Sequence, residues 1–331
     1  MKLNKTTTTF YLIAPANFAS GGPLLMHQLA SKLIGMGFKA KMMYIGQQSY
    51  INPVHEFYKR FKIPYTNIIT DIPENIAIFP EIYTGMIYHY KKIHKVIWWL
   101  SVDFFLAAIR PKPFSLRRFL GLKPTVYHYD FKKEPLLSHW VQSHYARHFL
   151  ESKSVTDIYN LSDYLDAIFI DKLKERSFTN QNKKNRIVYN PKKGFSDMLE
   201  LIRKAPYIDW FPIENITPSQ VRQLLLSAKI YIDFGNHPGK DRIPREAAMC
   251  GCIIVTNRKG SANFAEDIPI PDKFKIDFIP GKERDVIDLL ENCFTAYEKE
   301  VRHFDSYRKK IEQEEAVFNN DLSKIMTTFF D

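Results

Sequence analysis

The chain has 331 residues, of which 45% are hydrophobic and 25% charged, a balance typical of a folded globular protein that excludes disordered, collagen-like and coiled-coil chains. This length predicts about two domains. Lysine and arginine number 47 against 36 acidic residues, and the resulting net charge of +11 favours anionic partners: phosphorylated small molecules, nucleic acid or an anionic membrane.

Short apolar runs alternate with a helical pattern in the first half of the chain. The leucine and isoleucine spacing after Gly22 predicts a helix that ends at Gly35. This alternation predicts parallel βαβ units. The predicted strands cover residues 10–14, 41–45, 76–79, 95–100, 125–129 and 140–143.

A second alternating series begins near Asn185. Thr217 followed by Pro218 predicts a capped helix start, and the chain after Lys282 is mostly charged helix. The polar segment 173–185 is the expected linker. We therefore expect a first domain over 1–173, a second over 185–310 and a C-terminal helix over 311–331. The second series comprises strands 186–189, 208–211, 230–234 and 253–256, with helices 195–202, 218–228 and 244–249.

The cysteines and the hydropathy pattern indicate a cytoplasmic protein. Three cysteines without framework or zinc-site spacing suggest a reducing compartment. We see neither a secretory signal nor an apolar stretch of the ~20 residues that span a bilayer. Segment 104–123 mixes aromatic and basic residues, which fits a peripheral contact with an anionic membrane and, equally, a packing loop.

The loop 235–246 is the strongest candidate for an anion site. It follows a predicted strand and enters a helix near Pro244, where unpaired backbone N–H groups and the helix dipole favour an anion. Lys240, Arg242 and Arg245 add cations that suit a diphosphate, and Gly239 allows close approach. The alternative is a solvated basic loop.

Residues near this loop add to the predicted donor site. Lys192 and Lys193 follow another strand of the second series and either face the same anion or lie exposed beside a turn. Glu246, placed in the first turn of the helix, either accepts hydrogen bonds from a sugar or ribose or pairs with a neighbouring arginine.

In the first half, Gly21 and Gly22 lie between a strand and a helix and allow close approach of a ligand. The segment lacks the Gly-x-Gly-x-x-Gly pattern, so a nicotinamide dehydrogenase is poorly supported. His27, one turn into the helix, either faces a ligand or is packed.

Asp103 is the candidate general base. It follows an apolar strand, where a carboxylate can reach an acceptor hydroxyl; the alternative role is a helix N-cap. Asp130, His139 and His144 are weaker candidates of the same type. The sequence contains neither a basic stripe with aromatic interleaving nor a zinc or RNP-like motif, so nucleic acid is not an expected partner.

The segment from Arg245 to Thr256 resembles the Glu-Ala-x-Ala-x-Gly-x-Pro-Val-Val segment of GT-B glycosyltransferases. Residues 15–29 resemble their first glycine-containing loop and helix. Residues 142–150 and 189–194 are similar to segments of members that assemble polysaccharides, such as capsule or O-antigen. The resemblance implies an α/β GT-B fold: two Rossmann-like domains with parallel sheets facing an interdomain cleft, with the last helix packed back on the first domain.

The resemblance also implies a metal-independent transferase without a cofactor, which moves a sugar from a nucleotide-sugar diphosphate to a glycan or lipid-linked glycan acceptor. Glu246 matches the glutamate that contacts the donor. Pro238 stands where the family has an earlier glutamate, and the extra cations suit a donor rich in phosphate. Transfer of ribose 5-phosphate from phosphoribosyl pyrophosphate is therefore an alternative. A non-catalytic sugar-phosphate or nucleotide binding protein is an alternative of another class.

Overall fold

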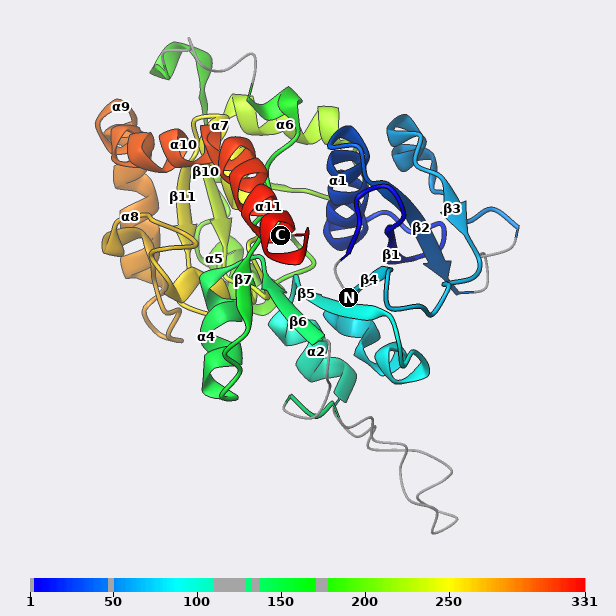
Figure 1. Cartoon of the computed structure of the whole chain (residues 1–331). Helices are drawn as coiled ribbons and strands as arrows, with labels where there is room; N and C mark the ends of the chain where they lie inside the picture. Colours follow the sequence, from blue (N-terminus) through cyan, green and yellow to red (C-terminus); the bar gives the residue numbers. More distant parts are fainter. Residues whose placement is uncertain (1–2, 47–50, 110–128, 132–136, 171–177, 331) are drawn as a thin grey trace. The chain divides into compact units, whose positions relative to one another are not determined.

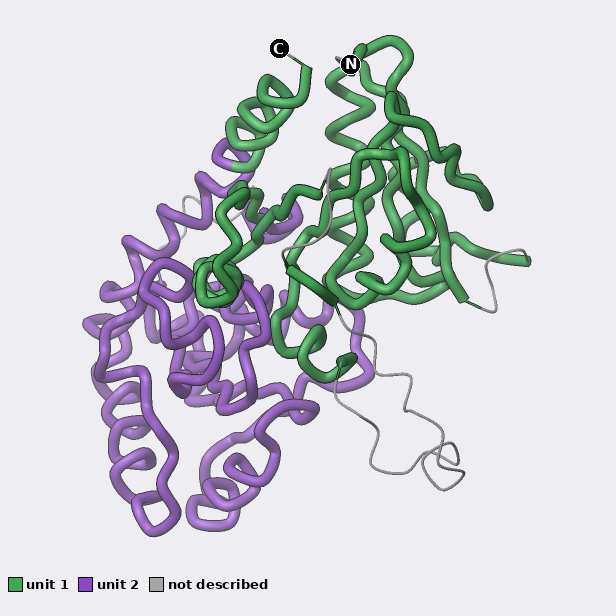
Figure 2. Tube along the Cα trace, turned by 60° about the horizontal axis from the view of Figure 1, so that its bottom comes forward, with its two compact units in different colours: residues 1–162, 318–331 green, residues 163–317 purple. Residues whose placement is uncertain are grey.

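The computed structural model describes residues 3–46, 51–109, 129–131, 137–170 and 178–330 (Figure 1). The chain forms two compact units, of which unit 1 comprises residues 1–162 and 318–331 and unit 2 comprises residues 163–317 (Figure 2). The chain therefore enters unit 2 after Ser162 and leaves it after Val317. This entry point lies before the linker that the sequence predicts at 173–185.

Unit 1 is built on a parallel sheet that, in the described residues, has seven strands in the order β3-β2-β1-β4-β5-β6-β7. The chain leaves β1 toward β2 and leaves β4 toward β5, so the connections diverge between these two neighbouring strands. The elements are β1 (Thr9–Pro15), α1 (Gly21–Gly35), β2 (Lys39–Ile45), β3 (Tyr65–Thr66), β4 (Ile76–Pro80), β5 (His94–Trp99), α2 (Val102–Ile109), β6 (Leu137–Val141), α4 (His144–Ser152) and β7 (Ile158–Asn160).

The core of unit 1 is rich in aromatic rings. Every residue of β4 is buried, as expected for a central strand that is covered on both faces. The final helix, α11 (Glu314–Phe330), belongs to this unit from Phe318 onward. The Phe330 ring near its end lies 5.0 Å from that of Phe38 and 6.3 Å from that of Phe10. The neighbouring Phe329 ring lies 6.3 Å from that of Trp140.

Unit 2 is built on a parallel sheet with four strands among the described residues, in the order β11-β10-β8-β9. All six residues of its central strand β10 are buried. The elements are β8 (Lys184–Tyr189), α5 (Phe195–Lys204), β9 (Asp209–Pro212), α6 (Pro218–Ser227), β10 (Ala228–Asp233), α7 (Arg242–Met249), β11 (Ile253–Thr256), α8 (Glu283–Thr295), α9 (Tyr297–Glu300) and α10 (Asp305–Glu312).

Most predicted elements are present within a few residues of their predicted bounds. The predicted cap of α6 is confirmed, because Thr217 and Gln220 form a reciprocal capping box ahead of Pro218. The short strands β3 and β7 were not predicted. The predicted strand at 125–129 and the segment 104–123 lie largely outside the described residues. None of the helices in the described ranges combines the length and apolarity of a bilayer-spanning segment.

Candidate functional site

The topology of unit 2 singles out one place on its sheet. β8 and β10 are neighbours, and the chain leaves β8 toward β9 but leaves β10 toward β11. Open parallel sheets bind ligands outside the carboxyl ends of two such strands, where the connections diverge. The loops at this point are residues 190–194 after β8 and residues 234–241 after β10. They include four of the eight predicted donor-binding residues, Lys192, Lys193, Gly239 and Lys240.

These loops lie in close contact with each other and with the loop after β11. Gly194 has a φ of +59°, and a Cβ there would lie 2.5 Å from the carbonyl carbon of Phe234. Gly260 has a φ of +57°, and its Cβ would lie 2.1 Å from the carbonyl oxygen of His237. Only glycine fits both the backbone conformation and the space at these two positions. The three loops therefore form one packed edge.

A buried charged network underlies the loop 234–241. Lys193 Nζ donates to Asp241 Oδ2 at 2.7 Å, and the same oxygen lies 3.1 Å from Nδ1 of His237. Asp233 accepts hydrogen bonds from the Tyr231 hydroxyl at 2.9 Å and from the Gly235 backbone N–H at 2.9 Å. The network fixes the loop through its side chains as well as its backbone.

The electrostatics of this network favour an imidazolium between carboxylates. Burial by itself lowers the pKa of His237, but the carboxylates of Asp241 and Asp233 outweigh it and raise this pKa above its ordinary value. Burial likewise opposes ionisation of Asp241, yet His237 and Lys193 hold its pKa below the usual range. Asp241 and His237 therefore stabilise each other as an ion pair.

Asp233, His237 and Asp241 offer ligand atoms that lie within 4.8 Å of one another, the spacing of a metal site. Both oxygens of Asp233 already accept hydrogen bonds, and Asp241 is paired with Lys193. A cation would have to displace these protein partners. The set fits an internal charge network better than a metal centre.

Arg245 is fully buried in unit 2 and surrounded by acceptors. Its Nη2 donates to Asp163 Oδ2 at 2.5 Å and to the carbonyl of Lys240 at 3.1 Å, and its Nη1 donates to Glu314 Oε2 at 2.7 Å. Its Nε donates to the carbonyl of Asp241 at 3.2 Å. Arg245 therefore holds the end of the loop 234–241 from inside, and its guanidinium is engaged by protein groups.

Lys240 joins the same cluster. Its Nζ lies 2.8 Å from Oε1 of Glu314 and 3.9 Å from Oδ1 of Asp163, and the side chain is only 9% exposed. The residue types and spacing predict that Lys240 and Arg245 contact a ligand phosphate. The structure instead gives both cations carboxylate partners inside unit 2, which assigns them a supporting role in the loop.

Arg242 and Glu246 form a second, separate pair. The helix α7 begins at Arg242 and not at Pro244, so Glu246 lies in its second turn and not in its first. Arg242 Nε donates to Glu246 Oε1 at 3.4 Å. Burial raises the pKa of Glu246, and the nearby Arg242 opposes this shift. No described residue accepts a hydrogen bond from the buried Nη1 of Arg242.

The remaining predicted residues of unit 2 lie on the same edge. The backbone N–H of Lys192 donates to Asn190 Oδ1 in a turn, and the Lys192 side chain is exposed. Gly239 accepts a hydrogen bond from Ser261 Oγ at 2.6 Å through its carbonyl oxygen. The structure thus brings Lys192, Lys193 and the loop 234–241 to one edge of the unit 2 sheet.

Gly21 and Gly22 open helix α1 in unit 1, and a Cβ at Gly21 would meet no described atom within 4 Å. The residue before them, Ser20, is held through both its N–H and its carbonyl by the Tyr58 hydroxyl, at 3.0 Å each. The backbone at this helix start is therefore both fixed and uncovered.

Asp103 lies in the first turn of α2 and accepts a hydrogen bond from the Tyr145 hydroxyl at 2.8 Å. Ser101 is the residue that caps this helix, because its Oγ accepts from the backbone N–H of Phe104 at 3.2 Å. The N-cap alternative for Asp103 is therefore wrong. His139, one of the weaker candidates, is a buried acceptor for the Trp99 indole N–H.

Sequence analysis missed Glu81, a buried acid directly after β4. Its Oε2 accepts a hydrogen bond from the backbone N–H of Leu100 at 2.9 Å, at the turn that leads to Asp103. Burial raises its pKa to about 7. The sequence places this acid directly after an apolar strand, and that position is the signal that could have identified Glu81 as a candidate.

Similar structures cover nearly the whole chain. Anabaena HepE in complex with UDP-glucose has a TM-score of 0.58 at 10% identity, over 97% of this chain and 99% of that one. A Rickettsia africae glycosyltransferase has a TM-score of 0.60 at 12% identity, over 97% of each chain. Sucrose-phosphate synthase from Thermosynechococcus elongatus has a TM-score of 0.64 at 8% identity, over 98% of this chain and 99% of that one.

The chain has the GT-B fold. The fold assignment rests on the two parallel sheets and on the match to these structures along their full length. It agrees with the fold that the resemblance in sequence predicts. At these low identities the similarity shows the fold alone. No protein-family model and no curated protein sequence matches the chain.

Proposed function

We propose that the chain is a glycosyltransferase that transfers a sugar from a nucleotide diphosphate to a glycan. The observation that carries this proposal is the full-length similarity to a GT-B structure in complex with UDP-glucose. The edge formed by the loops after β8 and β10 of unit 2 supports it, because it joins exposed and half-buried cations at the point where this fold class binds ligands.

In this proposal the donor diphosphate lies against Arg242, Lys192 and the backbone of Gly239, and Glu246 accepts hydrogen bonds from the donor sugar or ribose. Arg242 is favoured because its Nη1 donor has no acceptor among the described residues. Lys193, Lys240 and Arg245 then support the loop through Asp241, Glu314 and Asp163. The cations stabilise the charge that develops on the leaving diphosphate.

The acceptor side is assigned to unit 1. The acceptor hydroxyl forms a bond to the anomeric carbon as the bond to the diphosphate oxygen breaks, and Asp103 takes the hydroxyl proton. The Tyr145 hydrogen bond orients the Asp103 carboxylate for this step. Gly21 and Gly22 allow close approach of the ligand. The acceptor we propose is a surface glycan or its lipid-linked precursor, met at an anionic membrane face.

Ribose 5-phosphate transfer from phosphoribosyl pyrophosphate is the second candidate. Its support was the number of cations in the loop 235–246, which exceeds what one diphosphate requires. Since Lys240 and Arg245 already neutralise Asp163 and Glu314, this support is weaker than the sequence suggested.

A thermal-unfolding screen with UDP, UDP-glucose, phosphoribosyl pyrophosphate and NAD separates these candidates. A ligand of the folded state at about 100 times its Kd adds about 2.7 kcal/mol of stability. We expect a UDP ligand to stabilise the wild type and Arg242→Ala to lose most of that shift. Arg302→Ala, which removes an exposed arginine elsewhere in unit 2, is the matched control.

Each outcome of this screen favours a different candidate function. Stabilisation by phosphoribosyl pyrophosphate alone selects the second candidate, and stabilisation by NAD alone points to a dehydrogenase. A UDP-sugar that binds without release of UDP in the presence of glycan acceptors indicates a binding protein. If no ligand of the set stabilises the chain, or if Arg242→Ala behaves like its control, the proposed donor site is rejected.

A further inference from the structure

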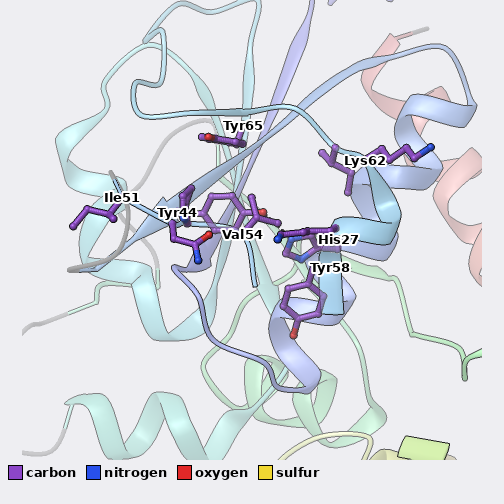
Figure 3. Close-up of a pocket in the computed structure, with 11 residues that line it drawn as sticks. His27, Tyr44, Ile51, Val54, Tyr58, Lys62 and Tyr65 are labelled. Carbon is purple, nitrogen blue, oxygen red and sulfur yellow. Dashed lines mark hydrogen bonds between the residues drawn. The ribbon is translucent and has the colours of Figure 1, made fainter. Parts of the chain in front are cut away.

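Unit 1 contains a cavity of about 340 Å³, and none of the residues assigned above to the donor or the acceptor lines it (Figure 3). Its walls are formed by His27 of helix α1, Tyr44 of strand β2 and side chains from residues 51–65. Its lining combines aromatic rings, aliphatic side chains and two lysines. The lining residues are His27, Tyr44, Ile51, Asn52, Pro53, Val54, Tyr58, Lys59, Lys62, Ile63 and Tyr65.

The buried part of the cavity wall is held by hydrogen bonds and is uncharged. His27 Nδ1 lies 2.6 Å from the carbonyl oxygen of Pro23, which can only accept, so Nδ1 carries the ring proton. Nε2 lies 2.8 Å from the Tyr44 hydroxyl and accepts from it. Burial lowers the pKa of His27 to about 4, which keeps the ring neutral at physiological pH.

Two tyrosines extend this aromatic surface. The Tyr58 ring stacks on His27, with centroids 4.2 Å apart and planes 20° apart, and its hydroxyl fixes Ser20. The Tyr65 ring meets Tyr44 edge-on, with centroids 5.9 Å apart, and remains 51% exposed. Tyr65 therefore presents an open ring face at the cavity, held by a buried partner.

The described ionised side chains that line the cavity are all positively charged. Lys59 and Lys62 are its only ionised groups among the described residues that line the cavity, which include neither Asp nor Glu. Lys59 is paired with Glu56 at 2.5 Å, and both of these side chains are exposed, so water screens the pair. Lys62, in contrast, has no carboxylate within ion-pair distance among the described residues. An anionic group on a ligand is therefore attracted mainly by Lys62, because Glu56 partly neutralises Lys59.

The residues that line the cavity indicate the chemistry of the ligand that it can bind. Aromatic ring faces pack against the C–H face of a sugar ring, and the Asn52 amide and the tyrosine hydroxyls suit its hydroxyl groups. The volume falls in the range of small-molecule sites. We propose that this cavity binds an acidic sugar, a pyranose that carries a carboxylate or phosphate, as the acceptor end of a glycan. The acceptor assignment rests on the proposed function, whereas the binding itself does not.

Binding to the full chain can be measured by titration calorimetry with methyl glucuronide, glucose 6-phosphate, methyl glucoside, inorganic phosphate and uridine monophosphate. We expect one or both acidic sugars to bind at least about tenfold more tightly than the neutral glucoside. The comparison of glucuronide with glucose 6-phosphate then distinguishes a carboxylate from a phosphate. Inorganic phosphate, which has no ring to stack, should bind more weakly than either.

Two exposed substitutions test the two halves of the site. We expect Lys62→Gln, which removes the charge, and Tyr65→Ala, which removes the ring face, each to weaken acidic-sugar binding by about fivefold or more. Lys41→Gln, at an exposed lysine of strand β2 that does not line the cavity, is the matched control and should bind as the wild type does. Thermal unfolding of each variant verifies that the fold is intact.

The proposal is overturned if neither acidic sugar binds, if the neutral glucoside, phosphate or uridine monophosphate binds as tightly, or if both variants match Lys41→Gln. The UDP-induced shift, measured in the same variants, reports on the donor site alone. Weakened acidic-sugar binding in these variants beside an intact UDP shift supports the cavity. In the wild type, absence of acidic-sugar binding beside an intact UDP shift rejects this cavity, and acidic-sugar binding without a UDP shift rejects the proposed donor site.

Discussion

Nη2 of Arg245 donates a hydrogen bond to Oδ2 of Asp163 at 2.5 Å, although the two residues are 82 positions apart in the sequence. Both side chains are fully buried. The contact joins the start of helix α7 to the residue at which the chain enters unit 2. Charges in such a place are tolerated only when each has its partner.

Replacement of Arg245 should therefore lower the free energy of unfolding and not merely weaken donor binding. Arg245→Met leaves the carboxylates of Asp163 and Glu314 buried without their partner, and we expect a loss of about 3–5 kcal/mol in the free energy of unfolding. Urea denaturation measures this loss. The control is Arg203→Ala, at a side chain that is 67% exposed, which should change stability by about 0.5 kcal/mol or less. A loss equal to that control would contradict the supporting role.

The ion pairs of His237 should make the free energy of unfolding fall as the pH rises above 6.5. Because the folded-state pKa of His237 is raised, its contribution is complete below the unfolded-state pKa of 6.5 and is lost as the pH rises through the folded-state value. His237→Asn should remove this dependence. Denaturation between neutral and alkaline pH compares the two proteins, and parallel stability curves would show that His237 is not protonated in the fold.

Glu81 should produce a second pH effect at lower pH. Its folded-state pKa is raised from 4.5 to about 7, so its contribution is complete below 4.5 and is lost as the pH rises through about 7. This shift corresponds to about 3 kcal/mol for a fully buried carboxyl. Glu81→Gln keeps the size and an acceptor oxygen for Leu100, and we expect it to gain stability over the wild type at neutral pH. An equal loss of stability at every pH would argue against a protonated acid.

Asp103 should affect turnover and leave the fold intact. Asp103→Asn keeps an acceptor for the Tyr145 hydroxyl but cannot take a proton, and we expect the transfer rate to fall by about 10²–10⁴. Tyr145→Phe, which removes the orienting hydrogen bond, should lower kcat less than Asp103→Asn does. Rates of UDP release measure both. Full turnover of Asp103→Asn would dismiss it as the base.

Sequence periodicity predicted the central strands well because a strand buried on both faces is a continuous apolar run, as in β4 and β10. It missed β3, because two residues at a sheet edge carry no periodicity. The predicted start of α7 was also wrong, because Pro244, which favours the first position of a helix, is the third residue of this helix.

The candidate site was only partly predictable. The sequence located the loop 235–246 by its glycines, cations and helix start, all of which are local signals. The partners of those cations are not local: Glu314 lies 69 residues from Arg245, and Asp241 lies 48 residues from Lys193. Whether a lysine or arginine faces a ligand or a buried carboxylate depends on such contacts, which no spacing in one sequence encodes.

The placement of Phe330 beside Phe10 and Phe38 has a consequence for biosynthesis. Residues 318–330 of the last helix belong to the first unit, but the ribosome adds them only after the whole of the second unit. When residues 1–162 have left the ribosome, Phe38 still lacks its contact with Phe330. It remains so while residues 163–317 emerge and fold. Completion of the amino-terminal half is thus delayed until the second unit has been synthesised.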